Sequence, residues 1–137
     1  MRATTLYHIA AGIFLLFAVG HTLGFLKFKP ATPEGNAVRI AMDRQTFSVG
    51  GKTFTYGGFY RGFGLMISGH LVFSVLLAWH LGNMAATTPM AIGPLGWAFF
   101  GLQVVSLVLS WIYFFPAPVV LSALVAACLG WAAWLTN

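Results

Sequence analysis

The sequence predicts an all-α membrane protein: an antiparallel bundle of four transmembrane helices, with a short amphipathic helix and a small β-hairpin between the first two. Hydrophobic residues make up 59% of the 137 residues and charged residues only 7%, whereas an average soluble domain has about 25% charged residues. Arg61 is the last charged residue, and the 76 residues after it contain no Asp, Glu, Lys or Arg. A chain this short cannot bury so much apolar surface in water, so a soluble helical protein is disfavoured.

The first span is predicted over residues 5–28. Its start resembles a secretory signal peptide, but the uncharged stretch over residues 3–26 is long enough to cross a bilayer, which takes about 20 residues. We therefore expect this helix to be retained as a span. Gly12, Gly20 and Gly24 lie near one face of it, a pattern typical of close packing against another helix.

A polar segment over residues 29–58 connects the first two spans. It opens with Thr-Pro-Glu at residues 32–34, which is typical of a helix start, because Thr caps the helix, Pro fits its first turn and Glu complements its dipole. The short helix that follows is amphipathic and is expected to lie along the membrane interface. Within it, Arg39 and Asp43 are spaced to form an ion pair across one turn.

A β-hairpin is predicted next, because two β-prone runs flank the glycines at residues 50–51. A two-residue turn at these glycines sets a register in which Phe47 faces Phe54 and Ser48 faces Thr53. Since an isolated hairpin is marginally stable in water, we expect the two phenylalanines to pack on helix ends or lipid.

Three more spans are predicted over residues 59–81, 95–115 and 119–135. The helix breakers at residues 82–83 and at residues 116–118 separate them. A chain of this length forms one domain at most, and we expect a single transmembrane domain over residues 1–137.

The distribution of positive charge predicts an orientation. Six of the seven Lys and Arg residues lie between Lys27 and Arg61, whereas the side of the termini carries only Arg2. The positive-inside rule places residues 29–58 in the cytoplasm and both termini on the opposite side of the cell inner membrane. Because these basic residues flank membrane spans, they indicate topology or lipid contacts and not nucleic-acid binding.

No predicted span contains Asp or Glu, which disfavours carboxylate proton relays, hydrolysis by paired carboxylates and di-iron centres within the membrane. The polar side chains that are left are the candidates for binding a ligand: His21, Arg61, His70, Gln103, Ser106 and Ser110. Gln103 and His70 are both expected near mid-bilayer, where each needs a hydrogen-bond partner and the other is the simplest one. Arg61 stands at a span boundary, where it either snorkels to lipid phosphates or contacts an anionic ligand headgroup. For the histidines, the alternative is a hydrogen bond that locks helix packing.

The histidines raise the question of haem. His8 and His21 are 13 residues apart and His70 and His80 are 10 apart, whereas two ligands on one face of a helix need a spacing near 14. Stacked haems are therefore not indicated, and His21 and His70 are only weak candidates for the ligands of a single haem. Cys128 is the only cysteine. No hydrolase, zinc-protease or nucleotide-binding motif is present, so the sequence assigns no catalytic residue and no other metal site.

Three motifs occur in a fixed order along the chain: Gly20-His-Thr-Leu-Gly-Phe25, Phe59-Tyr-Arg-Gly-Phe-Gly-Leu65 and Phe114-Phe-Pro-Ala-Pro-Val119. Together they resemble an uncharacterised family of small bacterial four-helix integral membrane proteins, over essentially the whole chain. The resemblance implies this architecture and a bacterial membrane, and it implies no reaction. In size and number of spans, the chain is also broadly similar to DoxX-like membrane proteins.

The sequence therefore favours a binding or accessory protein without catalytic activity. It would hold a hydrophobic ligand near His21, His70 and Gln103, or a partner membrane protein or second copy through its glycine faces. The alternative is a membrane enzyme or redox subunit that uses His21 or His70 on a quinone- or sterol-like substrate. A transporter or channel is disfavoured, because the spans show no evident repeat and no charged pathway.

Overall fold

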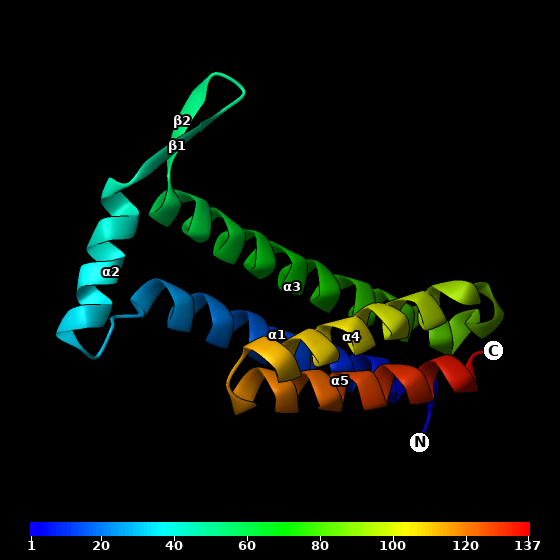
Figure 1. The fold of residues 1–137 in the computed structure, drawn as a ribbon. Coiled ribbons are helices and arrows are strands. Elements are labelled where there is room, and N and C mark those ends of the chain that lie inside the picture. Colours follow the sequence, from blue (N-terminus) through cyan, green and yellow to red (C-terminus); the bar gives the residue numbers. More distant parts are fainter. The chain divides into compact units, whose positions relative to one another are not determined.

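The computed structural model describes residues 1–137, and it consists of helices and one two-stranded antiparallel sheet (Figure 1). In order, the elements are α1 (Ala3–Lys27), α2 (Pro33–Arg44), β1 (Thr46–Val49), β2 (Lys52–Thr55), α3 (Tyr56–Thr87), the 3-10 turn η1 (Pro89–Ala91), α4 (Pro94–Tyr113) and α5 (Pro116–Leu135). The predicted fold class, an all-α protein with a small hairpin between the first two long helices, is confirmed.

Four helices, α1, α3, α4 and α5, are long and apolar enough to cross a membrane, as in a multi-pass membrane protein. In the most apolar part of each helix, between 11% and 33% of the residues are buried. Most of their side chains therefore face outward, where lipid is the solvent that suits them.

The bounds of three long helices lie within three residues of the predicted spans, but α3 is 32 residues long and continues to Thr87. The prediction that residues 82–83 end this helix is wrong. Asn83 Oδ1 forms a hydrogen bond with His8 Nε2 at 3.2 Å, and a Cβ at Gly82 would overlap the His8 ring. The additional turns of α3 are thus packed against α1.

The prolines at residues 116–118 mark the boundary between α4 and α5 as predicted. They belong to α5 itself, which begins at Pro116. Proline is well suited to the first helical position, where the backbone N–H that it lacks would have no helical partner.

The polar segment folds as the sequence predicts. The side chain of Thr32 caps α2 by accepting a hydrogen bond from the Gly35 amide at 3.1 Å. The hairpin has the predicted register, with Phe47 opposite Phe54 and Ser48 opposite Thr53. Both turn glycines, at residues 50–51, have positive φ angles of 58° and 76°, the left-handed conformation that a two-residue hairpin turn requires.

The chain forms two compact units, which we name the core unit (Met1–Ala18 and Leu71–Asn137) and the boundary unit (Val19–His70). Two of the four long helices, α1 and α3, contribute to each unit. The prediction of one domain over residues 1–137 stays a prediction.

The core unit holds the hydrophobic core, which draws on α1, α3, α4 and α5. Its largest fully buried side chains include Leu6, Tyr7, Phe14, Leu81 and Leu129. The rings of Phe14 and Phe99 stack with centroids 5.6 Å apart. Side by side in this unit, α4 and α5 form the tight antiparallel pair that the short connection between them dictates (Figure 1).

No neighbouring atoms pack against the three glycines of α1. A Cβ at Gly12, Gly20 or Gly24 would meet nothing within 4 Å. The expectation that this glycine face packs closely against another helix is therefore not met within the chain, and the face is open to lipid or to another molecule.

Candidate functional site

A cavity of about 310 Å³ lies within the boundary unit, between the end of α1, one side of α2 and the first turns of α3. Its lining is mostly apolar and includes Phe25, Leu26, Val38, Met42 and Tyr60. Because α1 ends and α3 begins here, the cavity lies at the polar end of two candidate spans. Three charged side chains, Arg39, Asp43 and Arg61, line it.

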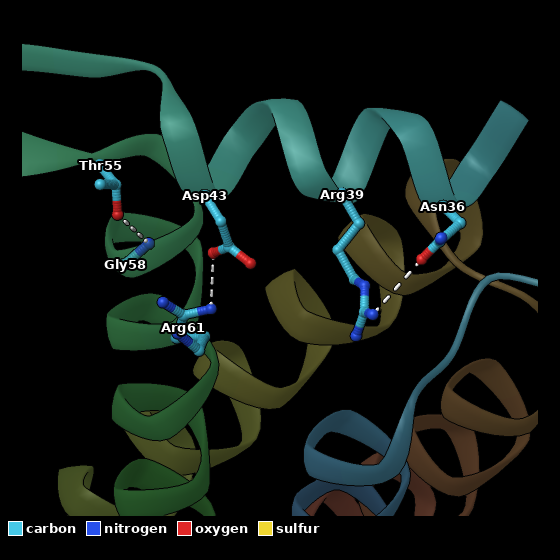
Figure 2. Close-up of polar contacts among 6 residues, drawn as sticks. All are labelled: Asn36, Arg39, Asp43, Thr55, Gly58 and Arg61. Atoms are coloured by element: carbon cyan, nitrogen blue, oxygen red, sulfur yellow. Dashed lines mark hydrogen bonds and ion pairs between the residues drawn. The ribbon is translucent and has the colours of Figure 1, made fainter.

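The helices that form the cavity approach each other through glycine. Gly57, in the first turn of α3, is buried, and a Cβ at this position would overlap the Asp43 carboxylate of α2. The start of α3 is itself fixed by Thr55, whose hydroxyl accepts a hydrogen bond from the Gly58 amide at 3.0 Å (Figure 2). Thr55 thus acts as the cap of α3. Because Thr55 is the last residue of the hairpin, this cap fixes the direction in which α3 leaves the hairpin.

An ion pair joins the two helices at the cavity. Asp43 Oδ1 accepts a hydrogen bond from Arg61 Nη1 at 2.8 Å, and the two side chains are 45% and 58% exposed (Figure 2). Arg39 lies on the same side of α2 and donates from Nη2 to Asn36 Oδ1 at 3.3 Å. The predicted pairing of Arg39 with Asp43 is therefore wrong, because Asp43 takes its partner from α3 and not from its own helix.

Aromatic rings form the wall of the cavity nearest α1 and α3. The rings of Phe25 and Tyr60 are 5.5 Å apart, and Phe25 lies so close to Gly64 that a Cβ there would overlap its ring. His21 also stacks on Phe25, with ring centroids 5.9 Å apart, and it does not line the cavity. The cavity therefore combines an apolar, aromatic interior with two guanidinium groups and one carboxylate.

Three of the predicted site residues, His21, Arg61 and His70, belong to the boundary unit. Only Arg61 lines the cavity. His21 donates from Nε2 to the Gly64 carbonyl at 3.1 Å, and His70 Nδ1 is 2.8 Å from the Met66 carbonyl of its own helix. The His21 contact matches the packing role that the sequence left open as the alternative, because it joins α1 to α3.

The other three predicted residues, Gln103, Ser106 and Ser110, belong to α4 in the core unit. Gln103 is buried and donates to the Ser122 carbonyl of α5 at 3.3 Å. Ser106 donates to the Leu102 carbonyl one turn earlier, and Ser110 is buried. Gln103 therefore has a backbone partner within its own unit, which meets the need that led us to expect a bond to His70.

The histidines do not assemble a metal site of the usual size. No group of three or more His, Cys, Asp or Glu side chains comes together in the chain. His8 stacks on Trp79 with ring centroids 4.4 Å apart in addition to its contact with Asn83. The hypothesis that His21 and His70 ligate a single haem stays untested, and the Nε2 atom of His21 would have to leave the Gly64 carbonyl to do so.

The sequence analysis did not identify Arg39, Asp43 and Tyr60 as site residues. The hairpin register carried a signal that could have identified Asp43. Thr46 pairs with Thr55, which places the end of α2 at Arg44 beside the start of α3 at Tyr56, and Asp43 and Arg61 lie within about two helical turns of these ends. The predicted hairpin thus brings together the two helix ends that carry the last acid and the last base of the chain.

Comparisons of the chain with protein-family models, with curated proteins and with solved structures find no match. The resemblance to a bacterial four-helix family therefore stays a prediction.

Proposed function

We propose that this protein is a non-catalytic, multi-pass membrane protein that binds an amphiphilic molecule in the cavity of the boundary unit. The apolar part of the molecule would lie against Phe25, Val38 and Met42, and its charged head would lie at Arg39 and Arg61. The observation that carries this proposal is the meeting of an apolar cavity with an exposed Asp43–Arg61 ion pair.

The size and the lining of the cavity support a small ligand. Its volume of about 310 Å³ is at the lower end of the range of ligand pockets, about 300–1,000 Å³, which are mostly apolar and carry a few polar groups that fix orientation. A cavity of this size would enclose the head and the first part of an acyl chain and leave the rest of the chain in lipid.

The position of the cavity supports an amphiphile over a purely apolar molecule. An apolar molecule such as a quinone or sterol would leave the two arginines without a role. Basic residues at the end of a span ordinarily interact with lipid phosphates. A bound amphiphile would keep its head at the level of these arginines, and its tail would follow α1 and α3 into the membrane.

We further propose the inner membrane of a bacterium as the location, with residues 29–58 on the cytoplasmic side. The support is the charge distribution and the motif resemblance given above. In this orientation, the cavity would face lipid and amphiphiles of the cytoplasmic leaflet.

Filling the cavity tests the proposal. Val38 lines it, whereas Ile40 belongs to the same helix and does not, so V38W and I40W form a matched pair. Native mass spectrometry of the full chain from a mild detergent should show a retained amphiphile on the wild type and on I40W. V38W should lose at least tenfold of the bound fraction while its helical circular dichroism stays that of the wild type.

Two results would contradict the proposal. The wild-type protein could carry no amphiphile, or V38W and I40W could retain it equally. A visible Soret band in the purified protein, abolished by H21A or H70A, would instead favour the redox alternative.

A further inference from the structure

We propose that the amphiphile is zwitterionic, with a phosphate that binds Arg61 and Arg39 and an adjacent ammonium that binds Asp43. This inference rests on the proposed function and specifies its ligand. The chemical class is a phospholipid whose phosphodiester is linked through two carbons to an amine.

The charges that line the cavity have both signs. They are the guanidinium groups of Arg39 and Arg61 and the carboxylate of Asp43, whereas the only other acid of the chain, Glu34, does not line it. A site for a purely anionic head would gain nothing from a carboxylate beside its arginines, because like charges repel. A zwitterionic head offers a partner to each of the three groups.

The charged groups of the cavity can form further hydrogen bonds to such a head group. Arg61 gives one donor, Nη1, to Asp43, and Arg39 gives one, Nη2, to Asn36, although each guanidinium has five N–H donors in a planar fork. Asp43 accepts through Oδ1, and its second carboxylate oxygen can accept from an ammonium. The ion pair therefore stays intact while both partners bind the ligand.

The spacing of the charges fits a two-carbon link between phosphate and amine. The opposite charges of Arg61 Nη1 and Asp43 Oδ1 are 2.8 Å apart, and Arg39 lies one helical turn from Asp43 on the same side of α2 (Figure 2). A carboxylate directly beside a guanidinium suits a head group whose phosphate and ammonium are close neighbours. The aromatic ring of Tyr60 in the same lining adds a surface that also attracts cations.

The expected selectivity is modest, because the ion pair is exposed. A contact between exposed charges is worth up to about 1 kcal/mol, which corresponds to roughly fivefold in affinity. We therefore expect a preference of about fivefold for phosphatidylethanolamine over phosphatidylglycerol with the same acyl chains.

The experiment uses the full chain in nanodiscs or mixed micelles that contain equal amounts of the two phospholipids, with native mass spectrometry as the readout. The wild type should retain phosphatidylethanolamine over phosphatidylglycerol about fivefold. D43N should lose the preference or reverse it, and the matched control E34Q, which removes the other acid of the chain, should keep it. D43E, which restores the carboxylate, should keep part of it.

A change in the ligand tests the same contact without any variant. N-acetylation of phosphatidylethanolamine removes the positive charge and leaves the phosphate, so the wild type should bind the acetylated lipid no better than phosphatidylglycerol. Equal retention of all three lipids, or a preference for phosphatidylglycerol, would overturn the inference and leave the proposed function in place. If the wild type retains none of the lipids and V38W behaves as the wild type, the proposed function itself fails.

Discussion

The core unit and the boundary unit share the long helices α1 and α3, and yet they bury very different residues. In the core unit, side chains such as Phe14, Leu81 and Leu129 are fully or almost fully buried among α1, α3, α4 and α5. In the boundary unit, only two residues are buried, and both are glycines, Gly57 and Gly64. Apolar packing therefore defines one unit and close backbone approach defines the other.

The contacts differ in the same way. The boundary unit contains an ion pair between Asp43 and Arg61, a hydrogen bond from His21 to the Gly64 carbonyl and one from Thr22 to Ser68 at 2.8 Å. Such polar contacts between helices are individually modest, about 0.6 kcal/mol on average in a membrane. A unit that depends on such contacts is held together more weakly than a unit with a packed apolar core.

The residues that pack the core and the residues proposed to bind a ligand are thus separated along the same helices. Residues that make the fold stable lie in the part of α1 and α3 that packs with α4 and α5. Residues that can contact a charged amphiphile lie where α1 ends and α3 begins, next to α2. The two groups of residues can therefore be changed independently, and the following predictions test this separation.

The largest effect is expected in the core unit. Leu129 is fully buried, whereas Leu124 of the same helix is 50% exposed, so L129A and L124A form a matched pair. L129A should lower the free energy of unfolding by about 2 kcal/mol, the lower end of the range for buried Leu→Ala, because in lipid only packing is lost. L124A should change it little, since lipid contacts this side chain in either state.

Equilibrium unfolding in a denaturing detergent, followed by tryptophan fluorescence, measures both values. Equal losses for the two variants would show that burial in the core unit does not control stability, and the comparison between the units would then fail.

The general fold could be predicted because its signals are local. The absence of charged residues after Arg61 marks three of the four candidate spans, and the two glycines at residues 50–51 fix the hairpin register. The full length of α3 was not predictable, because the extra turns are stabilised by contact of Asn83 with His8, 75 residues away in the sequence. Local breaker signals at Gly82 and Asn83 were outweighed by this tertiary contact.

The candidate site could be predicted only in part. Arg61 was identified from its position at a span boundary, and Gln103 from its polarity in an apolar helix. The partner of Gln103 is a backbone carbonyl of α5, and the sequence does not encode the offset between neighbouring helices that selects it. Asp43 was missed because an i,i+4 partner, Arg39, competed for it in the sequence pattern.

An intermediate effect is expected from a methyl group at the centre of the boundary unit. G64A places a Cβ against the Phe25 ring, and overpacking costs typically about 1–3 kcal/mol. Because the ring is only half-buried and can shift, we expect about 1 kcal/mol. F25A should remove the obstacle, so that G64A costs little in the F25A background, a coupling that a double-mutant cycle measures.

The control for this prediction is G62A, two residues earlier in α3, where a Cβ meets nothing within 4 Å. It should be neutral or slightly stabilising, because alanine is the better helix former. Additive effects of G64A and F25A would contradict the close contact between α1 and α3 in the boundary unit.

The smallest effect on global stability is expected in the hairpin, which contacts α3 through the rings of Phe47 and Phe59. Gly51 has a φ angle of 76°, and a residue with a Cβ costs roughly 1–2 kcal/mol in this conformation. G51A should therefore accelerate hydrogen exchange of residues 46–55 by about tenfold, whereas G50N should have little effect, because asparagine tolerates positive φ. Neither variant should change the unfolding free energy of the core unit. A loss as large as that of L129A would show that the hairpin and the core unfold together, and it would contradict the separation of stability from binding.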